Sequence, residues 1–304
     1  KISVSEDNIM AAQILDGKVL AATMREEIKV KTAELKERTG VVPGLGVVLV
    51  GDDPASRSYV TAKERALAEA GMFSQDVRLP AETSQAELLA TIERLNADPK
   101  VHGILVQLPL PKGLDEAAVI RAIAVEKDVD GFTPLNVGAM MIGEPCFLPC
   151  TPHGIIQMLI RSGTETAGKH AVVIGRSNIV GKPVAHLLAR KGAGGNATVT
   201  LCHTGTKDLA TFTRQAEIIV VASGHPNTLT GEMVKPGAVV IDVGVNRVPC
   251  AGTKTGYRLC GDCDFESVAQ VASLITPVPG GVGPMTITML LENTYQAALR
   301  ASVR

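Results

Sequence analysis

The sequence predicts an α/β protein with two α/β domains flanking a cleft, the second of them built on a Rossmann-type parallel sheet. Short runs of apolar residues, many of them β-branched, alternate with longer amphipathic segments, and most of the short runs are continuously apolar. Continuous apolar runs are typical of parallel strands that helices cover on both faces. The length of 304 residues exceeds one typical domain and also favours two.

The alternation defines the expected elements in chain order. In the first half we expect strands at Leu45–Val50 and Ile104–Leu108 and helices at Ala22–Arg38, Ser56–Ala70 and Gln85–Asn96. In the second half we expect strands at Ala171–Gly175, Ala197–Leu201, Glu217–Ala222 and Ala238–Val243, and helices at Pro152–Arg161, Lys182–Lys191 and Thr286–Arg300. Each helix is the natural cover for the parallel strands beside it.

Two proline-rich segments mark the expected domain crossings. Two prolines frame a helix start at 148–152, and a second proline-rich stretch covers 277–284. We therefore expect residues 1–150 plus 285–304 to form the first domain and residues 151–284 to form the second. The last helix would pack back on the first domain, and a cleft between two domains is a common place for a small-molecule site.

Composition excludes several classes of partner. The chain has 30 Lys and Arg against 31 Asp and Glu, so no basic excess points to nucleic acid or an anionic membrane surface. No apolar run approaches the roughly 20 residues of a membrane-spanning helix. Lys1–Met10 lacks the apolar region of a signal peptide and reads as a disordered lead-in. A targeting peptide that has been removed is the alternative, because no starting Met is present.

The cysteines predict buried thiols. Cys260 and Cys263 have the spacing of a redox or zinc motif, but no second pair and no nearby histidine completes such a site. We therefore expect no metal and a cytoplasmic location, where small buried thiols stay reduced.

A segment in the second half has the layout of a dinucleotide-binding turn. Residues 171–183 read as a strand, a tight turn and a helix, with Gly175 ending the strand and Gly181 opening the helix. A helix N-terminus binds phosphate because its free amides and its dipole favour an anion. Ser177 replaces the second glycine of the usual G-x-G-x-x-G spacing, so a purely structural turn is the alternative.

The charges around this turn favour NADP. NAD-binding turns usually place a carboxylate at the end of the next strand, where it binds the ribose hydroxyls. Here that strand ends in Leu201, Cys202, His203 and Thr204, without a carboxylate. Arg176 and the hydroxyls of Ser177 and Thr204 would suit a 2′-phosphate. Arg176 as an ordinary solvated surface charge is the alternative.

One lysine falls inside an apolar helical stripe. Val60, Leu67 and Ala70 form the stripe of the expected helix 56–70, and Lys63 lies within it, one turn from Tyr59 on the same face. A lysine among apolar neighbours loses hydration, which lowers its pKa and suits it to proton transfer. A lysine that extends from the edge of the stripe into water is the alternative.

Three further segments are candidates for a ligand site. Gln107 stands at the carboxyl end of a buried strand, where α/β sheets place ligands, although it also fits as a satisfied core amide. Asp130 precedes a glycine turn and fits the adjacent N–H donors of a pterin ring, with turn capping as the alternative. The three glycines and three prolines of 277–286 predict either a rigid backbone wall against a flat ligand or an ordinary tight loop.

These segments, in this order, resemble the bifunctional methylenetetrahydrofolate dehydrogenase/methenyltetrahydrofolate cyclohydrolase family. The similarity runs from about Ile14 to the C-terminal helix and is carried by Tyr59–Lys63, Val106–Pro111, Lys127–Gly131, Gly175–Gly181 and Pro277–Thr286. The resemblance implies a folate-binding catalytic first domain and an NADP-binding second domain. It also implies NADP-dependent oxidation of methylenetetrahydrofolate, followed by hydrolysis of the methenyl product to formyltetrahydrofolate, in one-carbon folate metabolism.

The resemblance also implies roles for individual residues. Lys63 would be the principal catalytic group, with Tyr59 beside it, Gln107 tuning it and Asp130 holding the pterin. The implied substrate contacts are Tyr59, Lys63, Gln107, Leu108, Asp130, Pro279, Gly280, Gly281 and Gly283. The implied cofactor contacts are Gly175, Arg176, Ser177, His203, Thr204 and Val245. The expected partners are tetrahydrofolate derivatives and a second copy of the chain, because the family typically forms homodimers through its cofactor domains.

Two departures from the family pattern bear on these expectations. Cys260 and Cys263 fill apolar positions, which weakens a metal interpretation further. The glycine-rich insertion 192–196 resembles the loop of mitochondrial members that use NAD, although Thr204 stands where those members carry an arginine. NAD therefore stays the alternative cofactor. A dehydrogenase with little cyclohydrolase activity and a nucleotide-binding regulatory module are the alternative functions.

Overall fold

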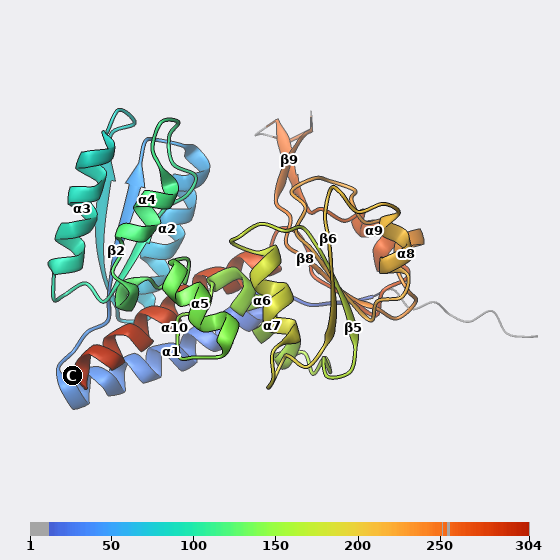
Figure 1. Cartoon of the computed structure of the whole chain (residues 1–304), viewed down its shortest axis with the longest axis horizontal. Coiled ribbons are helices and arrows are strands. Elements are labelled where there is room, and N and C mark those ends of the chain that lie inside the picture. Colours follow the sequence, from blue (N-terminus) through green and yellow to red (C-terminus); the bar gives the residue numbers. More distant parts are fainter. Residues whose placement is uncertain (1–11, 251, 254–255, 304) are drawn as a thin grey trace, which may run out of the picture. The chain divides into compact units, whose positions relative to one another are not determined.

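The computed structural model describes residues 12–250, 252–253 and 256–303 of the chain (Figure 1). The predicted lead-in Lys1–Met10 lies outside these residues. The chain forms two compact units, and each is described by itself. Of the described residues, unit 1 combines those up to Leu20 with Thr151–Met285, and unit 2 combines Ala21–Cys150 with those from Thr286 onward.

Unit 2 is built on a three-stranded parallel sheet with the strand order β3-β2-β4. Its strands are β2 (Gly44–Val50), β3 (Phe73–Leu79) and β4 (Gly103–Val106). Every residue of β2 and β4 is buried, as expected for parallel strands that are covered on both faces. The edge strand β3 has partly exposed residues along its whole length.

Helices α2 and α3 connect these strands, and three further helices follow β4. They are α2 (Pro54–Glu69), α3 (Gln85–Ala97), α4 (Glu116–Ala122), the 3₁₀ helix η1 (Val125–Lys127) and α5 (Pro134–Ile142). A reciprocal capping box starts α3, because Ser84 accepts from the amide of Glu87 while the Glu87 carboxylate accepts from the amide of Ser84. Leu88 and Ile92 of α3 then pack against Ile104 in the core of the unit.

The long helices α1 (Gly17–Thr39) and α10 (Val282–Ser302) lie side by side in unit 2 (Figure 1). Arg25 Nε donates a 3.0 Å hydrogen bond to Thr288 Oγ1. The Lys31 ammonium lies 3.3 Å from the Glu292 carboxylate. The last helix of the chain thus packs in the unit that contains the three-stranded sheet.

Unit 1 is built on a six-stranded sheet with the order β1-β11-β8-β7-β5-β6, in which all neighbours are parallel. Its strands are β1 (Gln13–Ile14), β5 (His170–Ile174), β6 (Thr198–Cys202), β7 (Ile218–Val221), β8 (Val239–Asp242) and β11 (Leu274–Ile275). The remaining elements are α6 (Cys150–Arg161), α7 (Gly181–Ala189), α8 (Leu209–Thr213), η2 (Gly231–Met233), α9 (Phe265–Ala269) and an antiparallel pair of β9 (Asn246–Pro249) and β10 (Tyr257–Cys260).

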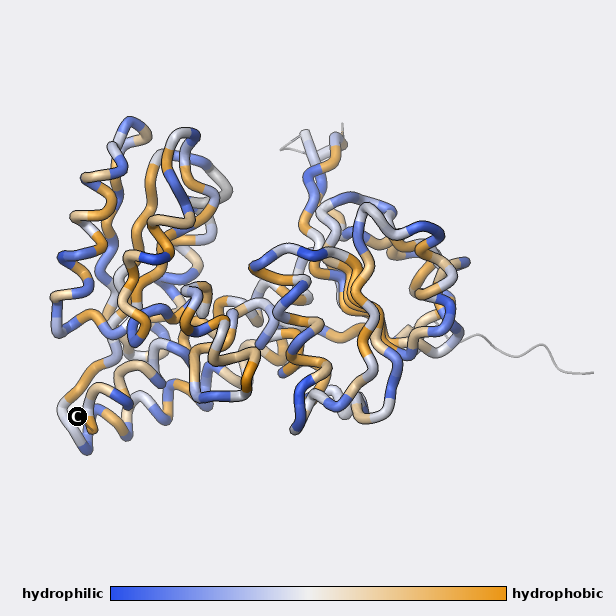
Figure 2. Tube along the Cα trace, in the orientation of Figure 1, coloured by the Kyte–Doolittle hydropathy of each residue, from blue (hydrophilic) through white to orange (hydrophobic). Residues whose placement is uncertain are grey.

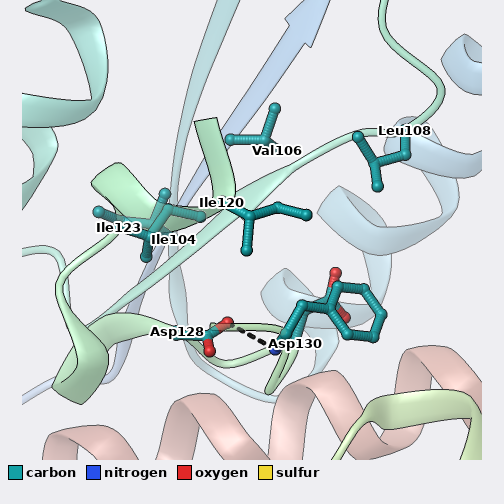
Figure 3. A pocket seen from close by; sticks show the side chains of 8 residues that line it. Ile104, Val106, Leu108, Ile120, Ile123, Asp128 and Asp130 are labelled. Carbon is teal, nitrogen blue, oxygen red and sulfur yellow. Dashed lines mark hydrogen bonds between the residues drawn. The ribbon is translucent and has the colours of Figure 1, made fainter. Parts of the chain in front are cut away.

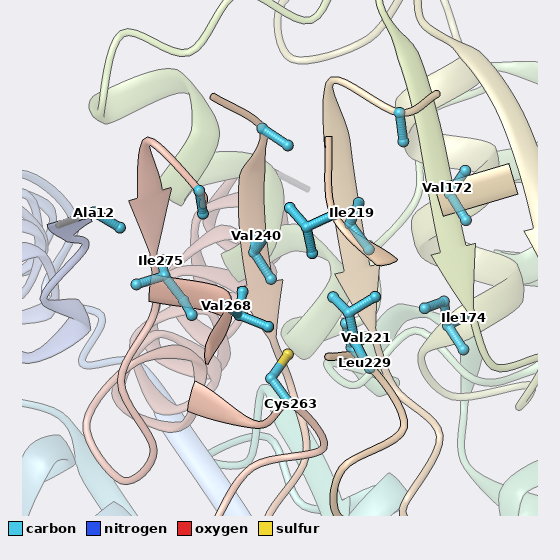
Figure 4. Packing of buried hydrophobic residues seen from close by; sticks show 14 of the residues in the cluster. Ala12, Val172, Ile174, Ile219, Val221, Leu229, Val240, Cys263, Val268 and Ile275 are labelled. Carbon is cyan, nitrogen blue, oxygen red and sulfur yellow. The ribbon is translucent and has the colours of Figure 1, made fainter. Parts of the chain in front are cut away.

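The core of unit 1 lies on the central strands. Val172, Ile219, Val240 and Ile275 come from four neighbouring strands and are almost fully buried (Figure 4). Apolar residues follow the strands of both units, while hydrophilic residues are frequent on the helices (Figure 2). Among the described residues, no helix has the combined length and hydropathy that a membrane-spanning segment needs.

The strand order of unit 1 contains a topological switch point. The chain passes from β5 to β6 on one side and then returns to β7 on the other side of β5. In open α/β sheets, ligands bind outside the carboxyl ends of the strands at such a point. The residues that follow β5 and β7 are therefore candidates for a ligand site.

The α/β fold with two domains, one of them on a parallel sheet, is confirmed, and the cleft between the domains stays a prediction. Every predicted strand and helix is present with similar bounds. The strands β1, β3, β11 and the β9–β10 pair, the helices α4, α5, α8 and α9, and the 3₁₀ helices η1 and η2 were not predicted. The expected first domain included all residues up to 150, whereas Gln13 and Ile14 pair with β11 in the sheet of unit 1. The strand is only two residues long, which is too short for a pattern to show.

Candidate active site

Lys63 is a buried cation in the middle of α2. Its residue is 7% exposed, and its stripe neighbours Val60, Leu67 and Ala70 are also buried. The spacing of three and four residues brings all four to the same helix face. The predicted burial of Lys63 inside the apolar stripe is confirmed. The alternative prediction, that the Lys63 side chain extends into water, is wrong.

Gln107 holds the ammonium group of Lys63. Lys63 Nζ donates a 2.9 Å hydrogen bond to Gln107 Oε1. Gln107 Nε2 in turn donates a 2.7 Å hydrogen bond to the carbonyl oxygen of Leu108. Gln107 directly follows β4, so its amide is fixed at the carboxyl end of a buried strand.

Asp130 lies in a turn that a second carboxylate organises. Asp128 is 1% exposed, and its two oxygens accept from the amides of Phe132 and Thr133 and from Nδ2 of Asn136. These bonds fix the backbone on both sides of Asp130. Asp130 itself is half-buried and takes no part in this set of bonds. Turn capping, the alternative role considered for Asp130, is thus performed by Asp128.

A small pocket adjoins Asp130 (Figure 3). Its lining is mainly apolar and comes from β4, α4 and the Asp130 turn. The lining residues are Ile104, Val106, Leu108, Ile120, Ile123, Asp128, Asp130 and Phe132. The volume of the pocket is only about 10 Å³, so it is a small apolar recess beside the Asp130 carboxylate and is too small to hold a ring by itself.

Burial shifts the pKa values of Lys63 and Asp130 toward each other. Loss of hydration lowers the pKa of the Lys63 ammonium, and the charges of Asp130 and Cys150 oppose this shift. Loss of hydration also raises the pKa of the Asp130 carboxyl, and the charge of Lys63 opposes that shift. A lysine with a lowered pKa exchanges a proton near neutral pH more readily than an exposed one.

The structure adds Cys150 and Asn293 to this group, which sequence reasoning missed. Cys150 Sγ donates a 3.3 Å hydrogen bond to the carbonyl oxygen of Val129, and burial raises the pKa of its thiol. Asn293 Nδ2 of α10 donates to the carbonyl oxygens of Val129 and Leu148 at 2.7 and 3.0 Å. The prolines on either side of Cys150 could have drawn attention to it, because they mark a helix start. No sequence pattern distinguishes Asn293 from the other polar residues of its helix.

Tyr59 differs from Lys63 in its surroundings. The two residues are one turn apart on α2, but Tyr59 is 40% exposed whereas Lys63 is buried. An exposed aromatic ring next to a buried ammonium can stack on a ligand without losing packing in the protein core.

The predicted phosphate-binding turn lies at the switch point of unit 1. Gly175 has φ = 118°, and a Cβ there would lie 2.0 Å from the carbonyl oxygen of Ala222, directly after β7. A Cβ at Gly181 would lie 2.0 Å from the carbonyl oxygen of Gly175. Both positions therefore require glycine, because the end of β5, the turn and the start of α7 pack backbone against backbone.

Arg176, His203 and Thr204 occupy the same edge of the sheet. The amide of Gly175 donates a 2.8 Å hydrogen bond to the carbonyl oxygen of Cys202, so the residues after β5 and β6 are neighbours. Arg176 and Thr204 are exposed, and His203 is half-buried.

Ser177 caps the helix of this turn. Its Oγ accepts from the amides of Val180 and Gly181 at 3.1 and 3.3 Å. The hydroxyl proton remains for donation to an anion, although the oxygen is already used as an acceptor.

The segment Pro277–Thr286, expected to be either a rigid wall against a ligand or an ordinary tight loop, begins in unit 1. The amide of Gly281 donates a 2.8 Å hydrogen bond to the carbonyl oxygen of Pro277, and Gly280 has φ = 109°. A Cβ at Gly17 would lie 1.7 Å from the carbonyl oxygen of Gly281, so the start of α1 packs directly on this backbone. Pro279 is exposed in this segment, and Gly283 lies in the first turn of α10. These contacts within unit 1 hold the backbone of the segment, and both interpretations stay predictions.

Cys263 is a core residue and Cys260 is half-buried. Burial raises the pKa of the Cys263 thiol far above its ordinary value, with the charge of Asp242 acting in the same direction. Such a thiol stays protonated and packs as a small apolar side chain. Within the described ranges, no cluster of three or more His, Cys, Asp and Glu side chains suits a metal ion.

Val245 is presented at the carboxyl end of β8. Its residue is 52% exposed. The preceding residue, Gly244, donates from its amide to Asp242 Oδ1 at 3.0 Å, and a Cβ there would lie 2.1 Å from Asp262 Oδ1. The Val245 segment is therefore held against two buried carboxylates that the sequence did not single out.

Two family models match this chain, one over the residues around Lys63 and one over the residues around the Gly175 turn. The family model described as tetrahydrofolate dehydrogenase/cyclohydrolase, catalytic domain, matches residues 15–130. The model described as tetrahydrofolate dehydrogenase/cyclohydrolase, NAD(P)-binding domain, matches residues 149–302. The first match contains Lys63, Gln107 and Asp130, and the second contains the Gly175 turn.

Individual relatives are similar over nearly their whole length. Bifunctional protein FolD of Moorella thermoacetica is 60% identical over 291 residues, which are 96% of this chain and 100% of that protein. The crystal structure of FolD from Campylobacter jejuni has a TM-score of 0.89 and 49% identity, covering 95% of this chain and 99% of that one. The Trypanosoma brucei methylenetetrahydrofolate dehydrogenase-cyclohydrolase, solved with NADP and an inhibitor, has a TM-score of 0.91 and 41% identity, covering 97% and 99%. The chain therefore belongs to the tetrahydrofolate dehydrogenase/cyclohydrolase family.

Proposed function

We propose that this protein oxidises methylenetetrahydrofolate with NADP and hydrolyses the methenyl product to formyltetrahydrofolate, in one-carbon folate metabolism. The observation that carries the proposal is the buried Lys63 ammonium bonded to Gln107. Burying an ammonium costs folding free energy, so a buried lysine with a lowered pKa is a candidate for a functional residue. Membership of the family supplies the substrate class.

Lys63 is proposed as the group that moves the proton during hydrolysis. Water adds to the methenyl carbon and loses a proton, and the carbon–nitrogen bond then breaks as that nitrogen regains a proton. A neutral amine at Nζ accepts the first proton and can return it to the leaving nitrogen. The lowering of the Lys63 pKa by burial favours the neutral amine, and Gln107 Oε1 fixes the position of Nζ.

Asp130 is proposed as the residue that holds the pterin ring. Its carboxylate lies beside the apolar pocket and is suited to two parallel N–H donors. Tyr59 and Leu108 are proposed to contact the folate from the same unit. Pro279, Gly280, Gly281 and Gly283 are proposed as further folate contacts, because the backbone there is rigid and free of side-chain bulk.

The switch point of unit 1 fits a dinucleotide. NADP, when bound, supplies the acceptor for the hydride that leaves the methylene carbon. Gly175 and the N-terminus of α7 are proposed to receive the phosphates, since the glycines let the turn pack tightly at the switch point and the amides at a helix N-terminus favour an anion. Arg176, Ser177 and Thr204 are proposed to bind the 2′-phosphate, while His203 lines the adenosine side and Val245 the nicotinamide side.

A pair of assays tests this function. The protein should produce NADPH from methylenetetrahydrofolate and NADP, monitored by absorbance, at a higher rate than with NAD at equal subsaturating concentrations. It should also hydrolyse methenyltetrahydrofolate without any cofactor. Production of NADPH without hydrolysis would leave a dehydrogenase alone, and the absence of both activities would refute the proposal.

We further propose that the protein is a cytoplasmic homodimer that pairs through unit 1. The strand β6 is at the end of the six-stranded sheet, and Leu201 on it is 37% exposed. An edge strand with exposed apolar residues is suited to pairing with a second copy. Light scattering coupled to gel filtration should give twice the chain mass, and a monomeric mass at micromolar concentration would refute the dimer.

A further inference from the structure

We propose that Asp262 is a positioning residue for the cofactor site, in that its carboxylate fixes both the Ser223–Gly224 turn and the Val245 segment. The inference rests on the proposed NADP-dependent function. The hydrogen-bond partners of the Asp262 carboxylate are Ser223, Gly224 and Asn246, and none of these is a proposed substrate or cofactor contact. Asp262 acts through the backbone that follows β7 and the segment that follows β8.

Asp262 is a fully buried carboxylate whose two oxygens have different partners. Oδ2 accepts from the amides of Ser223 and Gly224 at 2.7 and 2.8 Å and from Ser223 Oγ at 3.0 Å. Oδ1 accepts from Asn246 Nδ2 at 2.8 Å. One side chain therefore joins two loops that leave the sheet from neighbouring strands.

The carboxylate of Asp262 is itself held on a rigid platform. Asp242 Oδ1 accepts from the amide of Asp262 at 2.9 Å, and Asp242 Oδ2 accepts from the amide of Cys263 at the same distance. The Cys263 side chain is embedded in the core beside Val221 and Leu229 (Figure 4). Movement of Asp262 would thus disturb the end of β8 and the core together.

The two loops that Asp262 joins border the switch point. The Ser223–Gly224 turn directly follows Ala222, whose carbonyl oxygen lies where a Cβ of Gly175 would be. The Val245 segment follows β8, the next strand in the sheet. Because Val245 is proposed to lie near the nicotinamide, its placement affects the geometry of hydride transfer, for which a small error in position is costly.

If Asp262 positions the cofactor site, its loss affects oxidation alone; if it only stabilises the fold, its loss affects oxidation and hydrolysis alike. Lys63, Gln107 and Asp130 belong to unit 2, whereas every partner of the Asp262 side chain belongs to unit 1. Loss of the Asp262 carboxylate should therefore impair NADP binding and oxidation while hydrolysis, assayed without cofactor, is kept. General destabilisation would reduce the two activities in parallel.

The test is Asp262→Asn, which keeps the volume but places an NH2 group against donors on one side. We expect its Kd and KM for NADP to rise by about 10- to 100-fold and its kcat for oxidation to fall, with hydrolysis within about twofold of wild type. The matched control is Glu266→Gln, the same change on an exposed residue of α9, which should alter none of these quantities. The Kd is measured by calorimetry with NADP alone.

Each outcome decides the inference. Unchanged NADP binding and oxidation in Asp262→Asn, or a parallel loss of oxidation and hydrolysis, would overturn it. If the wild-type protein binds NADP but produces no NADPH, the proposed function fails, while the comparison of the two Kd values still tests the role of Asp262. If the wild-type protein does not bind NADP, the proposed function and the inference about Asp262 both fail. Should Asp262→Asn not fold, Asn246→Ala removes the Oδ1 partner together with the 3.1 Å bond from Asn246 Nδ2 to the carbonyl oxygen of Gly261. An unchanged Kd for NADP would then overturn the inference.

Discussion

Lys63 in the middle of α2 donates a 2.9 Å hydrogen bond from Nζ to Oε1 of Gln107, the residue that directly follows β4. The bond joins two residues that are 44 positions apart in the chain. It satisfies one of the three donors of a buried ammonium, and Nζ makes no second hydrogen bond to the part of the chain that the structure describes. This relationship is the centre of the proposed hydrolytic site, and the first two predictions test it.

Lys63→Met should reduce hydrolysis of methenyltetrahydrofolate by at least about 100-fold, because general acid–base catalysis contributes roughly 10²–10⁴-fold. Methionine keeps much of the volume of the lysine stem, so the thermal midpoint and the Kd for NADP should change little. Arg65→Met, on the exposed side of the same helix, is the matched control and should retain full activity. Wild-type hydrolysis by Lys63→Met would end the assignment.

Gln107→Glu should move the ascending limb of the pH profile of hydrolysis to higher pH. Burial lowers the pKa of Lys63, and a carboxylate beside Nζ would raise it again by stabilising the protonated form. Since the proposed base is the neutral amine, a raised pKa means that a higher pH is needed to form it. The measurement is the rate against pH for both proteins, and a limb that stays in place or moves to lower pH would contradict the role of Gln107.

Asp130→Asn should weaken folate binding by about 1.5–3 kcal/mol and leave NADP binding nearly unchanged. An amide accepts only one of the two hydrogen bonds that a pterin donates, and its NH2 group opposes the other donor. Calorimetry with tetrahydrofolate and with NADP measures the two affinities. Glu126→Gln, an exposed carboxylate in the same segment, serves as the control. An equal loss for both ligands would indicate a structural role instead.

Arg176→Ala should raise the KM for NADP by about 10- to 100-fold and change the KM for NAD little. The guanidinium is exposed at the end of β5 and is expected to pair with the 2′-phosphate, which NAD lacks. Lys191→Ala, which removes an exposed charge just beyond α7, is the control. If wild type prefers NAD, the glycine-rich insertion at 192–196 was the better guide to the cofactor.

Asn293→Leu should destabilise unit 2 by about 1–3 kcal/mol, because the carbonyl oxygens of Val129 and Leu148 lose a buried donor. Urea denaturation measures the loss. The same change should weaken folate binding, since the bond to Val129 anchors the turn that carries Asp130. Unchanged stability and unchanged folate affinity together would show that Asn293 does not hold this turn.

Much of the fold could be predicted from the sequence because the relevant forces are local. The continuous apolar runs that became β2, β4, β5 and β7 report burial directly, and glycine and proline mark turns through their own backbone preferences. The burial of Lys63 was predictable for the same reason, since helical spacing alone places it in a stripe with Val60 and Leu67. The strand β1 was not, because two residues carry no period and are strand only through their partner β11.

Only the tertiary structure decided which polar groups face each other. The bond from Lys63 to Gln107, the donation of Asn293 to the Asp130 turn, and the joining of two loops by Asp262 each connect distant parts of the chain. A buried carboxylate or amide needs hydrogen-bond partners, and these come from distant parts of the chain. A sequence pattern does not show which partners they are. The residue types therefore indicated the chemistry, while the packing of the sheets and helices selected the partners.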